Sequence, residues 1–226
     1  MASPIAWRIA TVGAIRDETA TVRTFTLRVP DWPGHRPGQH VDLRLTAEDG
    51  YSVERIPDGE VSAFLHDVVV AGDQLEVRGP IGGYFVWDVP IGGPLLLVAG
   101  GSGVVPLMAM LRHRSRERSD VPTRLLLSSR NADDIIYRDE LDRLAAAGDG
   151  FEVVHTLTRS RPTGWSGYDR RIDDRMLAEV LEPLGSGARC YICGPTALVE
   201  VAANALVRLG LPPDRVRTER FGPTGT

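Results

Sequence analysis

The residues best suited to bind a charged ligand lie in a glycine-rich run, GGSGVVP, at positions 100–106. The run follows the apolar stretch PLLLVAG and precedes a helical pattern, so it occupies a strand-to-helix turn. Glycines let the main chain approach a pyrophosphate closely, and the free N–H groups of a helix N-terminus favour negative charge. We expect a nucleotide here; the alternative is that the glycines only turn the chain. The candidate ligands are Gly100, Gly101, Ser102, Gly103, Val104 and Pro106.

The two cysteines are the other residues with evident chemistry. Cys190 and Cys193 stand in the sequence CYIC. Two thiols are too few for an iron–sulfur cluster, which is usually held by four, so any such cluster is expected on a partner. The histidines show no metal-ligand spacing with these cysteines, and we expect no bound metal.

Two types of element must position these residues. From Trp7 to about Val89, short β-rich runs alternate with turn sequences, which is typical of an antiparallel barrel or sandwich. They are WRIATVGAI, ATVRTFTLRV, QHVDLRL, YSVERI, DQLEVRG and GYFVWDV. From Gly92 onward, apolar strands alternate with helices, which predicts a parallel, doubly wound sheet with a nucleotide crevice at its strand ends. The predicted domains are therefore residues 1–90 and 91–226.

Composition narrows the function. The 226 residues, 42% of them apolar, can form a sizeable core in one or two domains. The formal net charge is -4 with both signs interspersed, which gives no electrostatic case for nucleic acid. There is no run of eighteen or more apolar residues and the start of the chain does not read as a signal peptide, so we expect a cytoplasmic protein without a membrane segment.

The chain resembles the ferredoxin–NADP reductase superfamily over nearly its whole length. The family's GGxGxxP loop is matched at 100–106, and its CGP sequence by Cys193, Gly194 and Pro195. The resemblance implies a flavin-binding β-barrel followed by an NAD(P)-binding α/β domain. It also places Cys193 beside the nicotinamide, where it helps to orient the ring; the other interpretation is a buried, inert thiol.

Basic residues after two strands favour NADPH over NADH. Arg130 follows the second predicted strand of the α/β domain, where an acidic residue would instead bind the ribose 2′-hydroxyl. Arg159 follows the third strand, and Arg161 is a weaker candidate. The alternative is that these are ordinary surface arginines. The predicted contacts are Ser128, Ser129, Arg130, Thr158 and Arg159.

The flavin half departs from the family pattern. The family's RxYS strand is reduced to Asp49-Gly50-Tyr51-Ser52, with an acidic residue in place of the phosphate-binding arginine. About twenty residues are missing after Ser52 relative to a typical member, which predicts a shortened, opened barrel. GEVS at 59–62 resembles the segment that meets the flavin pyrophosphate, although Ser62 also suits a helix N-cap. The predicted flavin contacts are Tyr51, Ser52, Glu60, Val61 and Ser62.

The C-terminal sequence RTERFGPTG resembles tails that lie beside the flavin in some members of the family. By that resemblance Phe221 contacts the ring and Glu219 supports proton handling; a packing role for the Phe is equally compatible. Together with Cys193 these are the predicted catalytic residues.

The sequence thus predicts an NADPH-dependent reductase. It passes a hydride from NADPH to FAD and electrons to a separate redox protein, whether a ferredoxin, a haem protein or an oxygenase component. The alternative is an NADP(H)-binding protein that has lost flavin binding and turnover.

Overall fold

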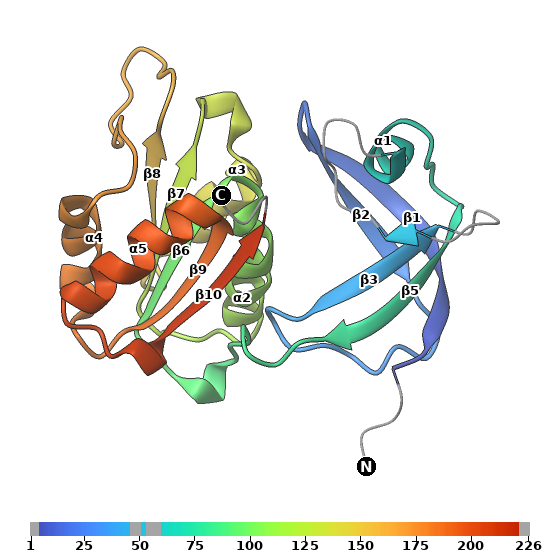
Figure 1. Ribbon diagram of the computed structural model, residues 1–226, viewed down its shortest axis with the longest axis horizontal. Helices are drawn as coiled ribbons and strands as arrows, with labels where there is room; N and C mark the ends of the chain where they lie inside the picture. Colours follow the sequence, from blue (N-terminus) through green and yellow to red (C-terminus); the bar gives the residue numbers. More distant parts are fainter. Residues whose placement is uncertain (1–4, 46–50, 53–59, 222–226) are drawn as a thin grey trace. The chain divides into compact units, whose positions relative to one another are not determined.

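The computed structural model describes residues 5–45, 51–52 and 60–221, and describes only the main chain at Leu45, Tyr51, Ser52 and residues 60–62. The chain divides into two compact units, which Figure 1 shows in ribbon form. One unit comprises Met1–His35 and Gln39–Gly83, and the other comprises Arg36–Gly38 and Tyr84–Thr226.

The N-terminal unit is an antiparallel sheet with the strand order β2-β1-β5-β3-β4, which confirms the predicted class of this half. Side chains alternate across it as strand geometry requires: Ala10 and Val12 face the core with Leu75 and Val77, while Ile9 is half exposed. The elements are β1 (Trp7–Thr19), β2 (Val22–Arg28), β3 (His40–Leu45), β4 (Tyr51–Ser52), α1 (Glu60–Asp67) and β5 (Gln74–Ile81).

Two local predictions in this part of the chain are wrong. The run GYFVWDV forms no strand; Phe85 and Trp87 are buried in an irregular segment of the second unit. Its polar groups find local partners instead of a ladder, since the Trp87 indole Nε1 donates to the Gly92 carbonyl at 2.8 Å. Helix α1 begins at Glu60, so Ser62 lies within its first turn and is not its N-cap.

The second unit is a parallel five-stranded sheet with the order β10-β9-β6-β7-β8, as predicted for a doubly wound domain. Its strands are β6 (Leu95–Gly100), β7 (Thr123–Ser129), β8 (Phe151–Leu157), β9 (Arg189–Pro195) and β10 (Val216–Phe221). Its main helices are α2 (Val104–Arg116), α3 (Arg138–Ala145), α4 (Asp174–Leu181) and α5 (Thr196–Arg208). From β6 the chain proceeds to one side through β7 and β8, then returns to β9 on the other side. This reversal is the topological switch point at which α/β sheets bind ligands.

Both faces of the parallel sheet are covered, which explains its continuous apolar strands. Leu96 and Val98 of β6 pack with α4 and α5 in one core cluster that also contains Cys190 and Ile192. Because successive strand residues point to opposite faces, Cys193 lies on the other side of the sheet from Cys190. The two thiols therefore cannot form a disulfide, which requires their Cβ atoms to face each other.

Helix α3 starts later than its sequence pattern predicts. The helical pattern in the sequence, DDIIYRDELDRLAAA, starts at Asp133, but Tyr137 adopts a left-handed conformation with φ 61° and α3 begins at Arg138. The loop after β7 instead contains a short 3-10 helix, Ala132–Asp134. Ile135 and Ile136 are buried between the two helices, and their burial overrides the helical pattern.

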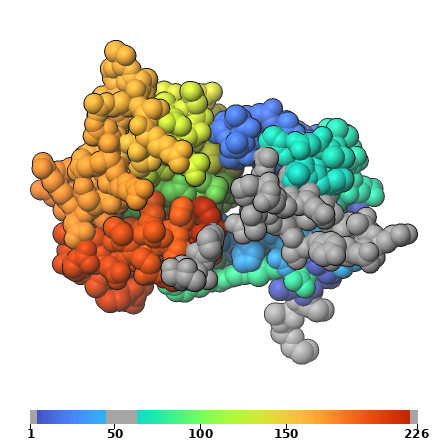
Figure 2. Space-filling view, turned by 45° about the horizontal axis from the view of Figure 1, so that its top comes forward, coloured from blue at the N-terminus to red at the C-terminus, as the bar shows by residue number. Residues whose placement is uncertain are grey.

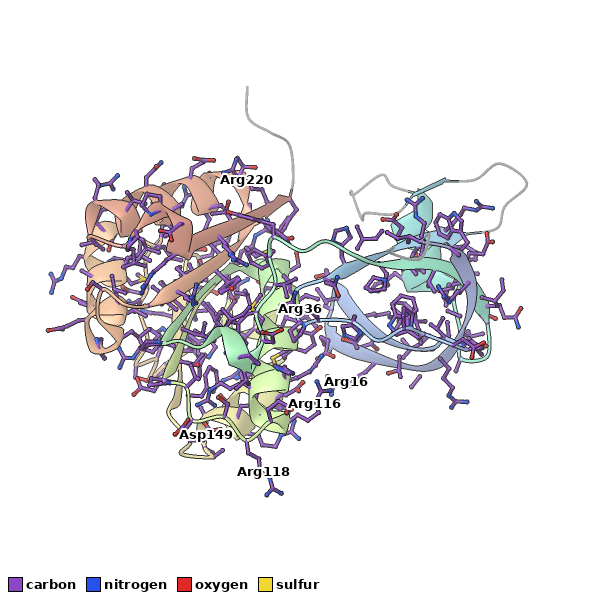
Figure 3. All side chains as sticks on the ribbon, turned by 90° about the horizontal axis from the view of Figure 1, so that it is seen from below. Arg16, Arg36, Arg116, Arg118, Asp149 and Arg220 are labelled. Carbon is purple, nitrogen blue, oxygen red and sulfur yellow. The ribbon has the colours of Figure 1, made fainter. Side chains whose placement is uncertain are left out.

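A buried arginine, Arg114, joins α2 to two loops at the end of the parallel strands opposite the glycine run. Arg114 of α2 is 2% exposed and forms an ion pair with Asp149, at 2.9 Å. Its Nε donates to the Val121 carbonyl at 2.8 Å. Figure 3 labels Asp149, which lies near the C-terminal end of α2. These contacts of Arg114, which we call the buried lock, join α2, the loop before β7 and the loop before β8.

Candidate nucleotide-binding site

The carboxyl ends of the parallel strands bring the predicted site residues of the second unit to one edge. Ala99 is in register with Cys193, and Cys193 with Glu219. On the other side, Gly100 is in register with Ser128, and Ser128 with Thr156. The glycine run, the CGP sequence and the C-terminal strand therefore meet along a continuous row.

The glycines at this edge allow a close approach of two main-chain segments. A Cβ on Gly103 would lie 2.0 Å from the Cys193 carbonyl oxygen, and one on Gly194 would lie 3.1 Å from the Gly100 nitrogen. A Cβ on Gly100 would lie 2.6 Å from the Leu198 Cδ1 atom. Gly101 instead needs its left-handed φ of 53°, with open space around its Cα. The run thus does more than turn the chain, because it packs against the end of β9.

Helix α2 begins directly after this turn. It starts at Val104, with Pro106 in its first turn as expected, and its N-cap Gly103 makes no side-chain cap bond. The Val104 N–H donates to carbonyl groups of the preceding turn, Gly101–Gly103. The positive end of the helix dipole lies at this turn, which suits it to an anionic ligand.

Cys193 is a buried, neutral thiol. It is 5% exposed, and burial raises its pKa to about 12, with the charge of Glu219 acting in the same direction. A thiol with a raised pKa is a poor nucleophile. The predicted role of Cys193 in orienting the nicotinamide stays a prediction. Its carbonyl group, against Gly103, fixes the spacing of the two turns.

Thr196 was not predicted from the sequence as a site residue. It is the first residue of α5, directly after Pro195, and its Oγ1 is buried without a hydrogen-bond partner. A polar ligand bound at this edge of the sheet would supply the hydrogen-bond partner that the buried hydroxyl lacks. Its position immediately after CGP was the available sequence signal. Together with the glycine packing, it shows that the residues present fit a nucleotide.

The ends of β7 and β8 remain joined beyond the strands themselves. The Thr158 N–H donates to the Ser129 carbonyl at 3.0 Å, and the Arg159 N–H donates to the Arg130 carbonyl at 2.9 Å. Arg130 and Arg159 are both exposed, whereas Arg161 forms an ion pair with Asp169. Figures 1 and 2 show the long connection after β8 projecting from this end of the unit.

The tail residues belong to a strand that the sequence did not predict. Glu219 and Phe221 lie on β10, which pairs in parallel with β9 and places Phe221 in register with Pro195. Phe221 is half-buried. The main chain thus brings Glu219 to Cys193, while the predicted roles of both residues in catalysis stay predictions.

The predicted flavin contacts lie in the N-terminal unit. The main chain of Tyr51 and Ser52 forms β4, whose Ser52 is in register with Arg44 of β3, and α1 starts at Glu60. The side chains of Tyr51, Ser52, Glu60, Val61 and Ser62 lie outside the described residues, as does Asp49. The roles of these residues as flavin contacts stay predictions.

Across the described part of the chain there is no cluster of three His, Cys, Asp or Glu side chains able to hold a metal ion. Within the same residues, no helix is both long and apolar enough to cross a membrane.

Comparison with known proteins agrees with this geometry. Residues 97–204 match the model of the oxidoreductase NAD-binding domain. The glycine betaine monooxygenase reductase subunit of Pseudomonas aeruginosa is 31% identical over 92% of this chain, which spans 62% of that protein's length. NADH-cytochrome b5 reductase 1 of Emericella nidulans is 31% identical, over 84% of this chain and 69% of that protein.

Solved structures show the same fold. The cytochrome b5 reductase domain of Ulva prolifera nitrate reductase superposes with a TM-score of 0.82 and 20% identity, covering 95% of this chain and 97% of that one. The chain belongs to the ferredoxin reductase-type family of FAD- and NAD(P)-binding oxidoreductases. The class of fold and the family predicted from the sequence are thereby confirmed.

Proposed function

We propose that this chain is an NADPH-dependent flavoprotein reductase, which passes a hydride from NADPH to FAD and electrons to a separate redox protein. The observation that carries the proposal is the contact between the glycine turn after β6 and the CGP turn after β9. A Cβ at Gly103 would overlap the Cys193 carbonyl group. Such close packing at a switch point is what a dinucleotide site requires.

The nicotinamide end of the dinucleotide is assigned to the CGP turn. There Cys193 and Gly194 set the position of the main chain, and the Thr196 hydroxyl offers an unused hydrogen-bonding group. The pyrophosphate is assigned to residues 100–106 and the start of α2. These groups orient the dinucleotide, and orientation is the main contribution that a protein makes to a hydride transfer between cofactors.

The adenosine end is assigned to the ends of β7 and β8. Arg130 and Arg159 are exposed and have no ion-pair partner within the described residues. A guanidinium group binds the 2′-phosphate of NADPH through paired N–H donors, and NADH lacks that phosphate. A relative of this chain is named an NADH enzyme, so the preference for NADPH rests on these two arginines.

The flavin is assigned to the N-terminal unit, with Tyr51, Ser52, Glu60, Val61 and Ser62 as its contacts. Bound there, FAD would supply the conversion of a two-electron hydride donor into a source of single electrons. Glu219 and Phe221 are assigned, with Cys193, the catalytic roles that the family resemblance implies. The domain assignment of residues 1–90 to the flavin and 91–226 to the nicotinamide dinucleotide forms part of this proposal.

The electron acceptor is proposed to be a separate protein. Relatives are named as reductase subunits or components of glycine betaine monooxygenase, propane 2-monooxygenase and naphthalene 1,2-dioxygenase systems. An oxygenase component, a ferredoxin or a haem protein is therefore the class of acceptor expected for this chain, and a cytoplasmic location is part of the proposal.

A second function is favoured by the sequence of the N-terminal unit. By the resemblance, Asp49 stands where the family has a phosphate-binding arginine. A chain with weakened flavin binding would act as an NADP(H)-binding protein without turnover.

Purification without added flavin, followed by incubation with excess FAD and desalting, separates these functions. The reductase is expected to retain FAD in about one-to-one ratio and to bind NADPH in calorimetry. Binding of NADPH without retained FAD would support the second function. Failure to bind NADPH would contradict both.

A further inference from the structure

The loop after β7 is joined to the loop after β8 by side chains as well as by the main chain. The Ser160 hydroxyl donates to the Asn131 Oδ1 atom at 2.7 Å. The Asn131 Nδ2 atom in turn donates to a carboxylate oxygen of Asp134 at 2.9 Å. Ser160, Asn131 and Asp134 thus form a hydrogen-bonded chain, which we call the loop tether.

The loop tether lies directly beside the two free arginines. Asn131 follows Arg130 and Ser160 follows Arg159 in the sequence, and the Ser160 N–H also donates to the Arg130 carbonyl, at 3.4 Å. Main-chain bonds fix where the two loops cross. Beyond that point, residues 160–164 of the loop after β8 are exposed, whereas the loop after β7 leads into the buried Ile135 and Ile136. The side-chain bond from Ser160 to Asn131 joins the exposed segment to the better-packed one.

The loop tether also engages the carboxylate of Asp134. Asp134 lies four residues after Arg130, at the end of the same short loop, and its carboxylate accepts from Asn131. A free carboxylate near the ribose would repel a 2′-phosphate and accept hydrogen bonds from a free 2′-hydroxyl. The bond from Asn131 leaves the charge of Asp134 in place, but it fixes the carboxylate and engages one of its oxygens, which is then less available to a ribose 2′-hydroxyl.

We propose that Asn131 and Ser160 are specificity-determining positioning residues, which hold Arg130 and Arg159 at the spacing needed for one 2′-phosphate and keep Asp134 away from it. This inference rests on the proposed use of NADPH. It assigns Asn131 and Ser160 no contact with the reacting atoms, and predicts an effect on the choice of dinucleotide with little effect on the rate of hydride transfer.

The test measures binding of 2′,5′-ADP and of 5′-ADP to the full chain by isothermal titration calorimetry. The variants are Asn131→Ala and Ser160→Ala, with Ser160→Thr as the conservative variant that keeps the hydroxyl. Ser166→Ala, in the same connection after β8 and exposed, is the matched control. Both ligands are fragments of the adenosine end of the dinucleotide and carry no nicotinamide, so the measured affinity does not depend on whether flavin is bound.

Wild-type protein is expected to bind 2′,5′-ADP more tightly than 5′-ADP. Ser160→Ala and Asn131→Ala are each expected to weaken 2′,5′-ADP by about three- to tenfold, the size of one net hydrogen bond, and to leave 5′-ADP within about twofold. Ser160→Thr and Ser166→Ala should match wild type.

Three results would overturn the inference, and they are distinguishable. If wild type prefers 2′,5′-ADP and neither Ala variant changes that preference, the positioning role is wrong and the NADPH proposal stands. If wild type shows no preference, the NADPH proposal fails and this inference fails with it. Equal weakening of both ligands by the variants would show a merely structural role.

Discussion

Replacing Gly103 by Ala tests the packing on which the nucleotide site depends. The added Cβ would lie 2.0 Å from the Cys193 carbonyl oxygen, 2.4 Å from its carbon and 2.8 Å from the Gly194 nitrogen. All three atoms belong to the main chain of a central strand, so none can rotate away. The turn after β6 must move by roughly 1 Å or more, which costs about 1–3 kcal/mol by analogy with overpacked cores. We expect the melting temperature to fall by several degrees.

The same displacement should weaken NADPH binding by at least about tenfold, because misplacing binding groups by about 1 Å has effects of that order. Two other glycines provide comparisons. Gly101→Ala meets open space within the protein but a left-handed φ, so it should cost about 1–2 kcal/mol of backbone strain, and its Cβ would lie in the loop assigned to the pyrophosphate. Gly187→Ala, whose Cβ would meet only a side-chain atom at 3.7 Å, should behave as wild type. Calorimetry and thermal melts check all three. A Gly103→Ala protein with wild-type stability and affinity would refute the reasoning.

Three further predictions follow from charges and burial. Arg130→Gln should raise the Kd for NADPH by about tenfold or more and leave that for NADH unchanged, because it removes a charge-assisted bond; equal loss of both ligands in calorimetry would contradict the assignment. Arg114→Met should lower the free energy of unfolding by about 2–3 kcal/mol in urea titrations, since it leaves carbonyl groups and a partly exposed carboxylate unpaired; Arg143→Met, at an exposed position, is the control, and equal stability of the two variants would count against the buried lock. The raised pKa of Cys193 means that its thiol is neutral when folded, so its contribution to stability is complete below the ordinary thiol pKa of 9.0 and is lost as pH rises toward about 12. In that range Cys193→Ser should lose stability less steeply than wild type, by about 1.4 kcal/mol per pH unit; identical slopes would show that the thiol is not buried.

The α/β half was predictable because its signals are local and repeated. Apolar strands such as PLLLVAG alternate with helices, and each element has its own local pattern in the sequence. This alternation predicts a parallel sheet. The glycine run and CGP turn come together because both end strands of that sheet. Their contact, Gly103 against the Cys193 carbonyl, follows from strand order, which places β9 beside β6.

The features that sequence reasoning missed depend on tertiary partners. The segment GYFVWDV has the composition of a strand, yet it is buried as an irregular segment because Pro37 and Gly92 supply its hydrogen-bond acceptors. Strand β10, VRTERF, is mostly polar and lacks the apolar alternation typical of a strand, and only its pairing with β9 makes it part of the sheet. The bond between Asn131 and Ser160 joins residues twenty-nine positions apart. No periodicity in the sequence marks such a pair.

The most direct test of the central claim is an anaerobic titration of the FAD-reconstituted, desalted protein with NADPH, followed by flavin absorbance. The account predicts that the long-wavelength flavin band bleaches with about one equivalent of NADPH, and that Gly103→Ala bleaches far more slowly under the same conditions. A flavin band that persists in excess NADPH, in protein shown to bind both cofactors, would contradict it.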